Sequence, residues 1–483
     1  MFINGELCDS ESGKTLTVVD PATEEGMATI PAGTAGDVQR AVAAAQAAFD
    51  TEVWSGLAPA ARGEALLKLA DALAAHQEEF AVLEASDVGK PIAESRAFDV
   101  PMAIDHLRYY GHLSVDLGGQ TIPVGAPVLD YTLKEPMGVV GEIIPWNFPL
   151  VLACRKLGPA LVAGNCVVLK AATWAPLTTL KLGELPAEAG LPAGVVNVLA
   201  GSGSVVGDAM VRHPAVHKVS FTGSSEVGCG IMECCAAHAK SVSLEMGGKS
   251  PAVVLADAEV DGAVAGILFG VFLNQGECCC AATRILVHES LHDEFTEKFV
   301  AAANAIKVGP PLDETTQMGP LVTREHWETV SRYVESGIAE GAKLLCGGPE
   351  KPEGRERGYY LAPTVFDEVA PALKIYREEI FGPVVTITSF KNFNEAAEMA
   401  NDTHYGLAAS IWTTNLRDGH VMAQKIKAGT VWVNVHNFVF STAPYGGYKL
   451  SGIGRELGRQ GVEAFMETKN VMVWLGEGAF SWY

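Results

Sequence analysis

The stretch Val139-Val-Gly-Glu-Ile-Ile144 begins the part of the chain that decides the fold. It has the composition of a short buried strand, and Cys166-Val-Val-Leu-Lys170 has the composition of the next one, with a helix expected between them at 150–163. The alternation continues with further helices and strands at 177–189, 195–199, after Ser204 and at 216–221. Such alternation predicts an α/β fold with a doubly wound parallel sheet, which binds ligands at the carboxyl ends of its strands.

A second alternating region follows Gly247 and predicts a second α/β unit. Its helices are expected at 260–273, 292–306 and 324–341, and its strands at 284–287, 384–390, 408–412 and 430–434. Ala- and Leu-rich periodicity before the first sheet predicts three more helices, at 38–49, 59–84 and 91–113. Between these regions, 121–124 and 128–133 look like a polar, extended strand pair, which we interpret as an arm between subunits.

Length and charge limit the classes of function. A chain of 483 residues is expected to form two or three structural units. A formal charge of −22 argues against nucleic acid or an anionic membrane as a partner. The amino terminus lacks the pattern of a signal peptide, and no uncharged apolar run approaches the roughly 20 residues of a membrane-spanning helix. We therefore expect a cytoplasmic protein.

The ten cysteines lack the spacing of a disulfide framework or a zinc site, so we expect reduced thiols and no metal. Three are consecutive, Cys278, Cys279 and Cys280, within the stretch from Phe272 to Arg284. A thiol here could be a covalent nucleophile if a base or an electropositive pocket forms its thiolate. Small buried thiols that only fill a core are an equal alternative on this stretch alone.

Two glycine-containing loops follow strands of the first region and open helices. They are Gly201-Ser-Gly-Ser-Val-Val-Gly207 and Phe221-Thr-Gly-Ser-Ser-Glu-Val-Gly228. Such loops can hold phosphates at a helix N-terminus, although the first has one residue too many for the dinucleotide fingerprint and could be a tight turn. Lys170 ends a buried strand, where it could meet a ribose or simply reach solvent. Together these features favour nucleotide binding.

Two further side chains have the chemistry of a catalytic site. Glu245 ends a strand and precedes two glycines that permit close approach, so it could be a general base or a surface charge. Asn147 lies between two prolines directly before a helix. A rigid amide suits an oxyanion donor, and a structural role in an aromatic turn is the alternative.

The chain resembles the aldehyde dehydrogenase superfamily over nearly its whole length. The resemblance lies in motifs that occur in family order: Pro145-Trp-Asn-Phe-Pro149, Phe221-Thr-Gly-Ser224, Glu245-Met-Gly-Gly-Lys-Ser-Pro251, Gly276-Glu-Cys-Cys279, Glu379-Ile-Phe-Gly-Pro383 and Pro444-Tyr-Gly-Gly-Tyr-Lys-x-Ser-Gly-x-Gly-Arg455. It implies a Rossmann-like cofactor domain, a second α/β catalytic domain and a small β arm for oligomerisation.

The resemblance also implies catalytic roles. Cys279 would attack the aldehyde to give a thiohemiacetal, while Asn147 and the backbone N–H of Cys279 hold the oxyanion. Glu245 would activate the water that hydrolyses the thioester, and it could also help to deprotonate the thiol. Lys170 is placed with these catalytic residues as well as with the cofactor. Because relatives that transfer the acyl group to coenzyme A typically lack the glutamate, Glu245 favours release of the free acid.

For the cofactor, NAD or NADP, the resemblance places Ile143 and Trp146 beside the nicotinamide and Lys170 on the adenosine ribose. The remaining implied cofactor residues are Gly203 and Gly207 beside the adenine, Ser224 with Phe221, Thr222 and Gly223 near the pyrophosphate, Met246, and Glu379 with Phe381 at the nicotinamide ribose. Thr173 stands where NAD-preferring relatives commonly have glutamate. Loss of that carboxylate removes repulsion of a 2′-phosphate, so we expect NADP to be accepted.

The resemblance implies a substrate pocket lined by Phe148, Leu152, Arg155, Cys278, Cys280, Val439 and Tyr445. Arg155 replaces a tryptophan that is common in enzymes for apolar aldehydes, and is similar to semialdehyde and hydroxyaldehyde dehydrogenases. It could bind a substrate carboxylate or hydroxyl, or pair with a nearby acid in a structural role. Leu273 stands where succinic semialdehyde enzymes have a second arginine, so that match is incomplete.

We therefore predict an NAD(P)-dependent, non-acylating dehydrogenase for a small polar or carboxylate-bearing aldehyde, as a homodimer or homotetramer. The predicted domains are 1–117 with 136–246 for the cofactor, 247–450 for catalysis, and 118–135 with 451–483 for oligomerisation. A coenzyme A-acylating enzyme and a non-enzymatic structural protein on the same fold remain the alternatives.

Overall fold

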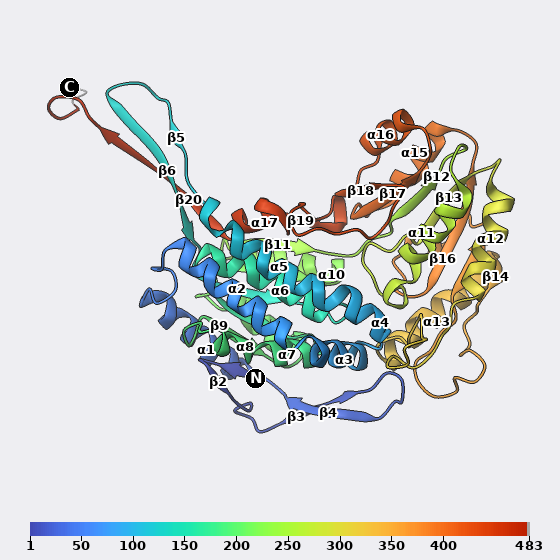
Figure 1. Cartoon of the computed structure of the whole chain (residues 1–483), viewed down its shortest axis with the longest axis horizontal. Coiled ribbons are helices and arrows are strands. Elements are labelled where there is room, and N and C mark those ends of the chain that lie inside the picture. Colours follow the sequence, from blue (N-terminus) through green and yellow to red (C-terminus); the bar gives the residue numbers. More distant parts are fainter. Residues whose placement is uncertain (481–483) are drawn as a thin grey trace.

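The computed structural model describes residues 1–480 and has two α/β units and a projecting arm of strands (Figure 1). The first unit contains an eight-stranded sheet in the order β19-β11-β10-β7-β8-β9-β1-β2. Its five central strands are parallel: β7 Val139–Ile143, β8 Cys166–Lys170, β9 Val196–Leu199, β10 Lys218–Thr222 and β11 Ser241–Glu245. The edges are the antiparallel β1 Phe2–Ile3, β2 Glu6–Leu7 and β19 Gly452–Ile453. The predicted doubly wound sheet is confirmed.

The order of these strands defines where a ligand can bind. From β7 the chain moves to β8 and β9 on one side, and then returns to β10 and β11 on the other. The strand order therefore reverses between β7 and β10, and a crevice opens at the carboxyl ends of such a pair. Asn147 follows β7 and Gly223 follows β10 at this point. The helix α6, Pro149–Ala163, comes next and is buried along its whole length because it packs between α5 (Val100–Leu113) and the sheet.

The second unit contains a seven-stranded sheet in the order β14-β15-β16-β13-β12-β17-β18. The bounds are β12 Pro251–Val254, β13 Arg284–His288, β14 Lys343–Cys346, β15 Thr364–Asp367, β16 Val384–Phe390, β17 Ala408–Trp412 and β18 Thr430–Val433. All but β14 are parallel to their neighbours. Since β11 ends at Glu245 and β12 begins at Pro251, the carboxyl edge of the first sheet meets the amino edge of the second.

Three predicted helices are wrong in detail. The helix expected at 177–189 is two short helices, α7 Leu177–Leu182 and α8 Leu185–Glu188. The single helix expected at 59–84 is two helices, α2 Pro59–Ala75 and α3 Gln77–Val88, because the backbone of His76 leaves the helical region at φ −106°. The helix expected at 91–113 begins as α4 Ile92–Glu94 and contains a π-helical turn, Ser95–Asp99, before α5. Such a turn widens a helix locally, and it brings Glu94, Phe98 and Asp99 to the wall of the central cavity.

The arm is a three-stranded sheet of β5 Thr121–Ile122, β6 Val128–Pro136 and β20 Met466–Trp474. The last strand pairs antiparallel with β6 from Met466 opposite Pro136 to Trp474 opposite Val128, as predicted, and Figure 1 shows both leaving the body together. Residues 451–463 do not join this arm, because β19 extends the first sheet and α17, Gly458–Glu463, packs on α6. Within residues 1–480, no helix is both long and apolar enough to span a bilayer.

Candidate active site

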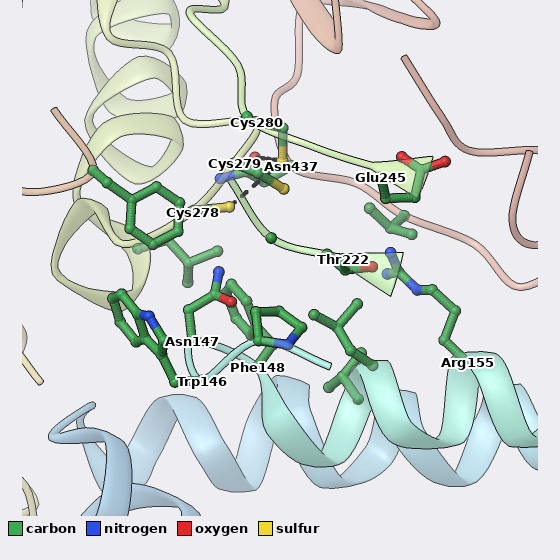
Figure 2. Close-up of a pocket in the computed structure, with 18 of the residues that line it drawn as sticks. Trp146, Asn147, Phe148, Arg155, Thr222, Glu245, Cys278, Cys279, Cys280 and Asn437 are labelled. Carbon is green, nitrogen blue, oxygen red and sulfur yellow. Dashed lines mark hydrogen bonds between the residues drawn. The ribbon is translucent and has the colours of Figure 1, made fainter. Parts of the chain in front are cut away.

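A cavity of about 310 Å³ lies where the two sheets meet (Figure 2). It gathers most of the residues that the sequence singled out: Trp146, Asn147, Phe148, Leu152, Arg155, Thr222, Gly223, Ser224, Glu245, Met246, Cys278, Cys279, Cys280, Glu379, Phe381, Val439 and Tyr445. The predicted residues outside its lining are Ile143, Lys170, Thr173, Gly203, Gly207 and Phe221. Groups from both units thus surround one cavity.

The three adjacent thiols differ in exposure. The side chains of Cys278 and Cys280 are 8% and 5% exposed, whereas Cys279 is half-buried. The two outer sulfur atoms lie 3.5 Å apart, and the Cys280 thiol donates to Asn437 Oδ1 at 3.2 Å. Cys279 Sγ lies 3.8 Å from the hydroxyl of Tyr445. Of the three, Cys279 is therefore the thiol most open to a molecule in the cavity.

The thiol of Cys279 needs help to ionise. Its hydrogen bond with Cys278 lowers the pKa of the thiol. The interaction with Cys280 and burial together raise the pKa by more, so that it reaches about 12. Because only the thiolate is a good nucleophile, a base or a hydrogen-bond donor must favour ionisation before attack.

A left-handed turn directly before the thiols fixes the predicted oxyanion donor. Asn274 and Gln275 have φ of 49° and 56°, a backbone conformation that costs energy in non-glycine residues. Buried bonds stabilise it: Asn274 Nδ2 donates to the backbone oxygen of Asn147 at 2.8 Å, and its N–H donates to Glu94 Oε2 at 3.0 Å. The amide of Asn147 donates to the backbone oxygen of Glu277 at 2.9 Å. One N–H of that amide then remains for a substrate oxygen.

Glu245 ends β11 and lines the same cavity with only 5% of its surface exposed. Burial, followed by the nearby Glu456, raises the pKa of its carboxyl well above the usual value, and Oε2 has no hydrogen-bond partner among the described residues. A carboxylate with a raised pKa is a stronger base than one in water, as a general base near neutral pH requires.

The two glycines after Glu245 are required by close contacts, as predicted. A Cβ at Gly247 would lie 2.1 Å from Glu379 Oε2, and a Cβ at Gly248 would lie 2.3 Å from the backbone oxygen of Cys279. Glu379 Oε1 accepts the N–H of Gly248 at 2.9 Å, and burial raises its pKa to about 8. These contacts hold the segment that follows Glu245 close to both Cys279 and Glu379.

Arg155 lies on α6 with its side chain 7% exposed and faces the cavity (Figure 2). Its guanidinium lies 5.1 Å from the ring centroid of Tyr445. Within the part of the chain that the structure describes it forms no ion pair and no side-chain hydrogen bond, and its Nε is buried without a partner. No ion pair among the described residues thus fixes Arg155 in a structural role, and Glu245 is the carboxylate whose pKa its charge lowers. A buried, unpaired cation is costly, so an anionic or polar ligand is expected beside it.

A second group of predicted residues lies at the carboxyl ends of β7 and β8. Gly207 faces both Lys170 and Ile143, because a Cβ on it would lie 3.7 Å and 3.8 Å from their side chains. Lys170 is 2% exposed and donates to the backbone oxygen of Ala171 at 2.9 Å, and burial lowers its pKa to about 8. Thr173 is exposed and donates to the backbone oxygen of Gly201 at 3.3 Å.

These groups fit a dinucleotide that runs from this crevice to the cavity. Ser224 is the N-cap of α10, Ser225–Ala236, and accepts the N–H of Val227 at 3.3 Å, so the helix N-terminus faces the crevice. Nothing within 4 Å opposes a Cβ at Gly203, which leaves space at the loop. Thr222 Oγ1 is buried without a partner among the described residues, and Lys170 still has protons to donate. Helix N-termini and spare donors of this kind suit phosphates and ribose hydroxyls.

An aromatic wall bounds the cavity near the crevice. The ring of Trp146 contacts His326 and Phe381 edge-on, with centroids 5.1 Å and 5.3 Å away, and is tilted against Trp174 at 5.8 Å. His326 Nε2 donates to the backbone oxygen of Phe381 at 2.7 Å. Trp146 was predicted beside the nicotinamide and Phe381 at its ribose, and this wall offers a flat apolar surface for such a ring.

Several cavity residues escaped the sequence reasoning. The chief one is Asn437, which accepts a hydrogen bond from the Cys280 thiol, and behind the lining Asn274 donates to the backbone oxygen of Asn147. Asn274 was within the cysteine stretch, but no pattern there indicated its left-handed backbone. Phe269 on α11 (Val260–Phe272) and Met102 on α5 add apolar lining, together with Leu273, which the sequence had already placed at the pocket. Among residues 1–480, no group of three or more His, Cys, Asp or Glu side chains is arranged to hold a metal ion.

Comparison with known proteins agrees with this geometry. The model of the aldehyde dehydrogenase family matches residues 7–471. The aldehyde dehydrogenase of Enchytraeus buchholzi is 45% identical over 475 residues, which are 98% of this chain and 95% of that protein. The mitochondrial aldehyde dehydrogenase of Homo sapiens is 44% identical, over 98% and 91%. The NAD+ complex of an aldehyde dehydrogenase from Bacillus cereus superposes with a TM-score of 0.97 at 43% identity, over 99% and 96% of the two chains.

Proposed function

Since the chain belongs to the aldehyde dehydrogenase family, and is thus an NAD(P)-dependent enzyme that oxidises aldehydes to acids, we propose that it acts on a small aldehyde bearing a carboxylate or hydroxyl group. The observation that carries this proposal is the unpaired guanidinium of Arg155 in the cavity that also contains Cys279. Planar guanidinium groups bind carboxylates through two hydrogen bonds.

In the proposed reaction Cys279 Sγ forms a bond to the carbonyl carbon, and the carbonyl electrons move to the oxygen. The free N–H of Asn147 and the backbone N–H of Cys279 stabilise this oxyanion. NAD(P)+, which Lys170, Ser224 and Glu379 would hold, would supply the hydride acceptor, and loss of the hydride from the adduct would leave a thioester on Cys279. Glu245 then takes a proton from the water that attacks the thioester, so the acid leaves and the thiolate returns. The raised pKa and burial of Glu245 support hydrolysis over transfer to coenzyme A.

Replacing Arg155 by leucine is expected to raise the KM for succinic semialdehyde about 10- to 100-fold, because a charge-assisted hydrogen bond contributes about 1.5–3 kcal/mol. For benzaldehyde, kcat/KM should stay the same or increase, since the pocket becomes more apolar. Initial rates with lactaldehyde, glyceraldehyde and both of these aldehydes measure the effect. Arg332→Leu, an exposed arginine on α13 (Arg324–Ala339), is the matched control. If Arg155→Leu leaves KM unchanged for every polar aldehyde, this substrate class is wrong.

For the cofactor, we propose that Lys170 binds the adenosine ribose, Ser224 and its helix the pyrophosphate, and Glu379 the nicotinamide ribose. Gly203 and Gly207 leave space near the adenine, and Trp146 and Phe381 bound the nicotinamide side. Ile143 was predicted beside the nicotinamide, but its side chain lies next to Gly207, outside the cavity, so we assign it to the adenosine side. Thr173 would turn its hydroxyl from Gly201 towards a 2′-phosphate. We therefore propose that NADP is accepted besides NAD.

Replacing Thr173 by glutamate is expected to lower kcat/KM for NADP roughly tenfold or more, because a carboxylate at this place repels the 2′-phosphate. For NAD the change should be small or favourable, since a carboxylate can accept ribose hydroxyls. Initial rates with both cofactors at one ionic strength measure the ratio. A strong NAD preference in the unchanged enzyme, with no shift in Thr173→Glu, would contradict the assignment.

We propose that the arm joins two copies of the chain in a dimer or a dimer of dimers. Its strands expose large apolar side chains, among them Leu129, Leu133, Met472 and Trp474, each at least 40% exposed. Three strands that project from the body cannot bury such side chains alone, and a second copy can cover them.

All ten cysteines are free, which supports a reducing compartment such as the cytoplasm.

A further inference from the structure

Tyr445 lies beside the reacting atom and not only in the pocket wall. It follows β18 in the loop that closes the cavity, and it is 6% exposed. Its N–H donates to the backbone oxygen of Glu456 at 2.7 Å, and its backbone oxygen accepts the N–H of Glu456 at 2.8 Å. This two-bond bridge fixes the backbone, so the position of the phenol is set by the fold. The hydroxyl reaches Cys279 Sγ at 3.8 Å.

The next residue keeps the loop close to the base as well. Gly446 has φ of 153°, and a Cβ there would lie 2.6 Å from Glu245 Oε1. Glycine at this place therefore lets one short segment approach the thiol with Tyr445 and the carboxylate with its backbone. The guanidinium of Arg155 lies over the Tyr445 ring, 5.1 Å from its centroid, and limits its movement.

We infer that the Tyr445 hydroxyl is a catalytic group that donates a hydrogen bond to the thiolate of Cys279 and so favours ionisation of this thiol. The inference rests on the proposed role of Cys279 as the nucleophile. It assigns to Tyr445 a contact with the reacting sulfur, beyond the lining of a substrate pocket.

The direction of the bond follows from the chemistry of the pair. Burial raises the pKa of the Tyr445 hydroxyl well above its usual value, so the phenol keeps its proton at any working pH. A thiolate has no proton to give. A protonated phenol next to a thiolate can therefore only be the donor, and a hydrogen bond to the charged form lowers the pKa of the acid that forms it.

The same bond changes as the reaction proceeds. When sulfur attacks the carbonyl carbon, its negative charge passes to the carbonyl oxygen and the sulfur becomes a weak acceptor. The hydrogen bond is therefore strongest in the free enzyme and weakest in the adduct. Tyr445 should increase the fraction of thiolate at neutral pH, and it should slightly lower the reactivity of each thiolate.

The test is the pH dependence of alkylation of Cys279 by iodoacetamide in the enzyme without cofactor or substrate, with the modified cysteine identified by peptide mass spectrometry. In Tyr445→Phe, which keeps the ring under Arg155, the apparent pKa of alkylation is expected to rise by about one unit or more, with about tenfold slower alkylation below that pKa. At high pH the rate should equal or exceed that of the unchanged enzyme. Tyr448→Phe is the matched control, because Tyr448 is exposed and does not line the cavity.

A second variant tests the sign. Incorporation of 3-fluorotyrosine at position 445 retains the packing and gives a more acidic, stronger donor, so the apparent pKa should fall. If both variants alkylate Cys279 with the pH profile of the unchanged enzyme, the role of Tyr445 is wrong while the proposed reaction stands. If the unchanged enzyme is alkylated first at Cys278 or Cys280, the proposed nucleophile is wrong, and the inference with it.

Discussion

Replacing Cys279 by alanine is expected to lower kcat for aldehyde oxidation by on the order of 10⁴-fold or more, because the proposed covalent intermediate forms on this sulfur. The cofactor should still bind with nearly unchanged affinity, since its predicted contacts come from the first sheet and Glu379. Steady-state rates and a fluorescence titration with NADH measure the two quantities.

The neighbouring thiols supply the controls for this prediction. Cys278→Ala and Cys280→Ala remove sulfur atoms that are less than 10% exposed and that contact one another. Their kcat should stay within about tenfold of the unchanged enzyme, with a loss of stability of about 1 kcal/mol from the small cavity. Equal losses of activity in all three variants would contradict the assignment of chemistry to one thiol.

Replacing Glu245 by glutamine is expected to slow steady-state turnover by about 10²- to 10⁴-fold, the range lost with a general base. The first turnover should survive, so NAD(P)H should appear as a rapid burst of about one equivalent per active site. Stopped-flow absorbance separates the burst from the slow phase. A loss of the burst as well as the slow phase would place Glu245 before hydride transfer and not in hydrolysis.

The raised pKa of Glu245 also fixes the sign of the pH dependence. Because burial and Glu456 keep this carboxyl protonated to a higher pH than usual, the base forms as pH rises. The hydrolysis rate of the unchanged enzyme should therefore increase with pH up to that pKa. Glu245→Gln should lack this increase, since an amide does not titrate in this range.

The strand alternation from Val139 to Glu245 was enough to predict the first sheet, because parallel strands buried on both faces are continuous apolar runs. Helix interruptions were harder to predict, because no proline or glycine marks His76 and none lies within the π-helical turn at 95–99. The strands β12 and β19 are short, and no local sequence pattern predicted them.

The active site, too, was predictable only in part. Motifs placed Asn147, Glu245 and Cys279, and the structure brings all three to one cavity. The sequence could not rank the three thiols, because their exposure depends on contacts with Asn437 and Tyr445, more than 150 residues away along the chain. Nor could it show that Arg155 lacks an acidic partner, which depends on the whole environment of α6.

The most direct test of the account is the location of the acyl group in Glu245→Gln. The variant is mixed with saturating NAD(P)+ and a substrate aldehyde, quenched in acid at the end of the burst, and digested for peptide mass spectrometry. If Cys279 is the nucleophile, an acyl mass is added to Cys279 at close to one per chain, and Cys278 and Cys280 are unmodified. An acyl group on either neighbour, or a full burst with no acyl group on the protein, would contradict it.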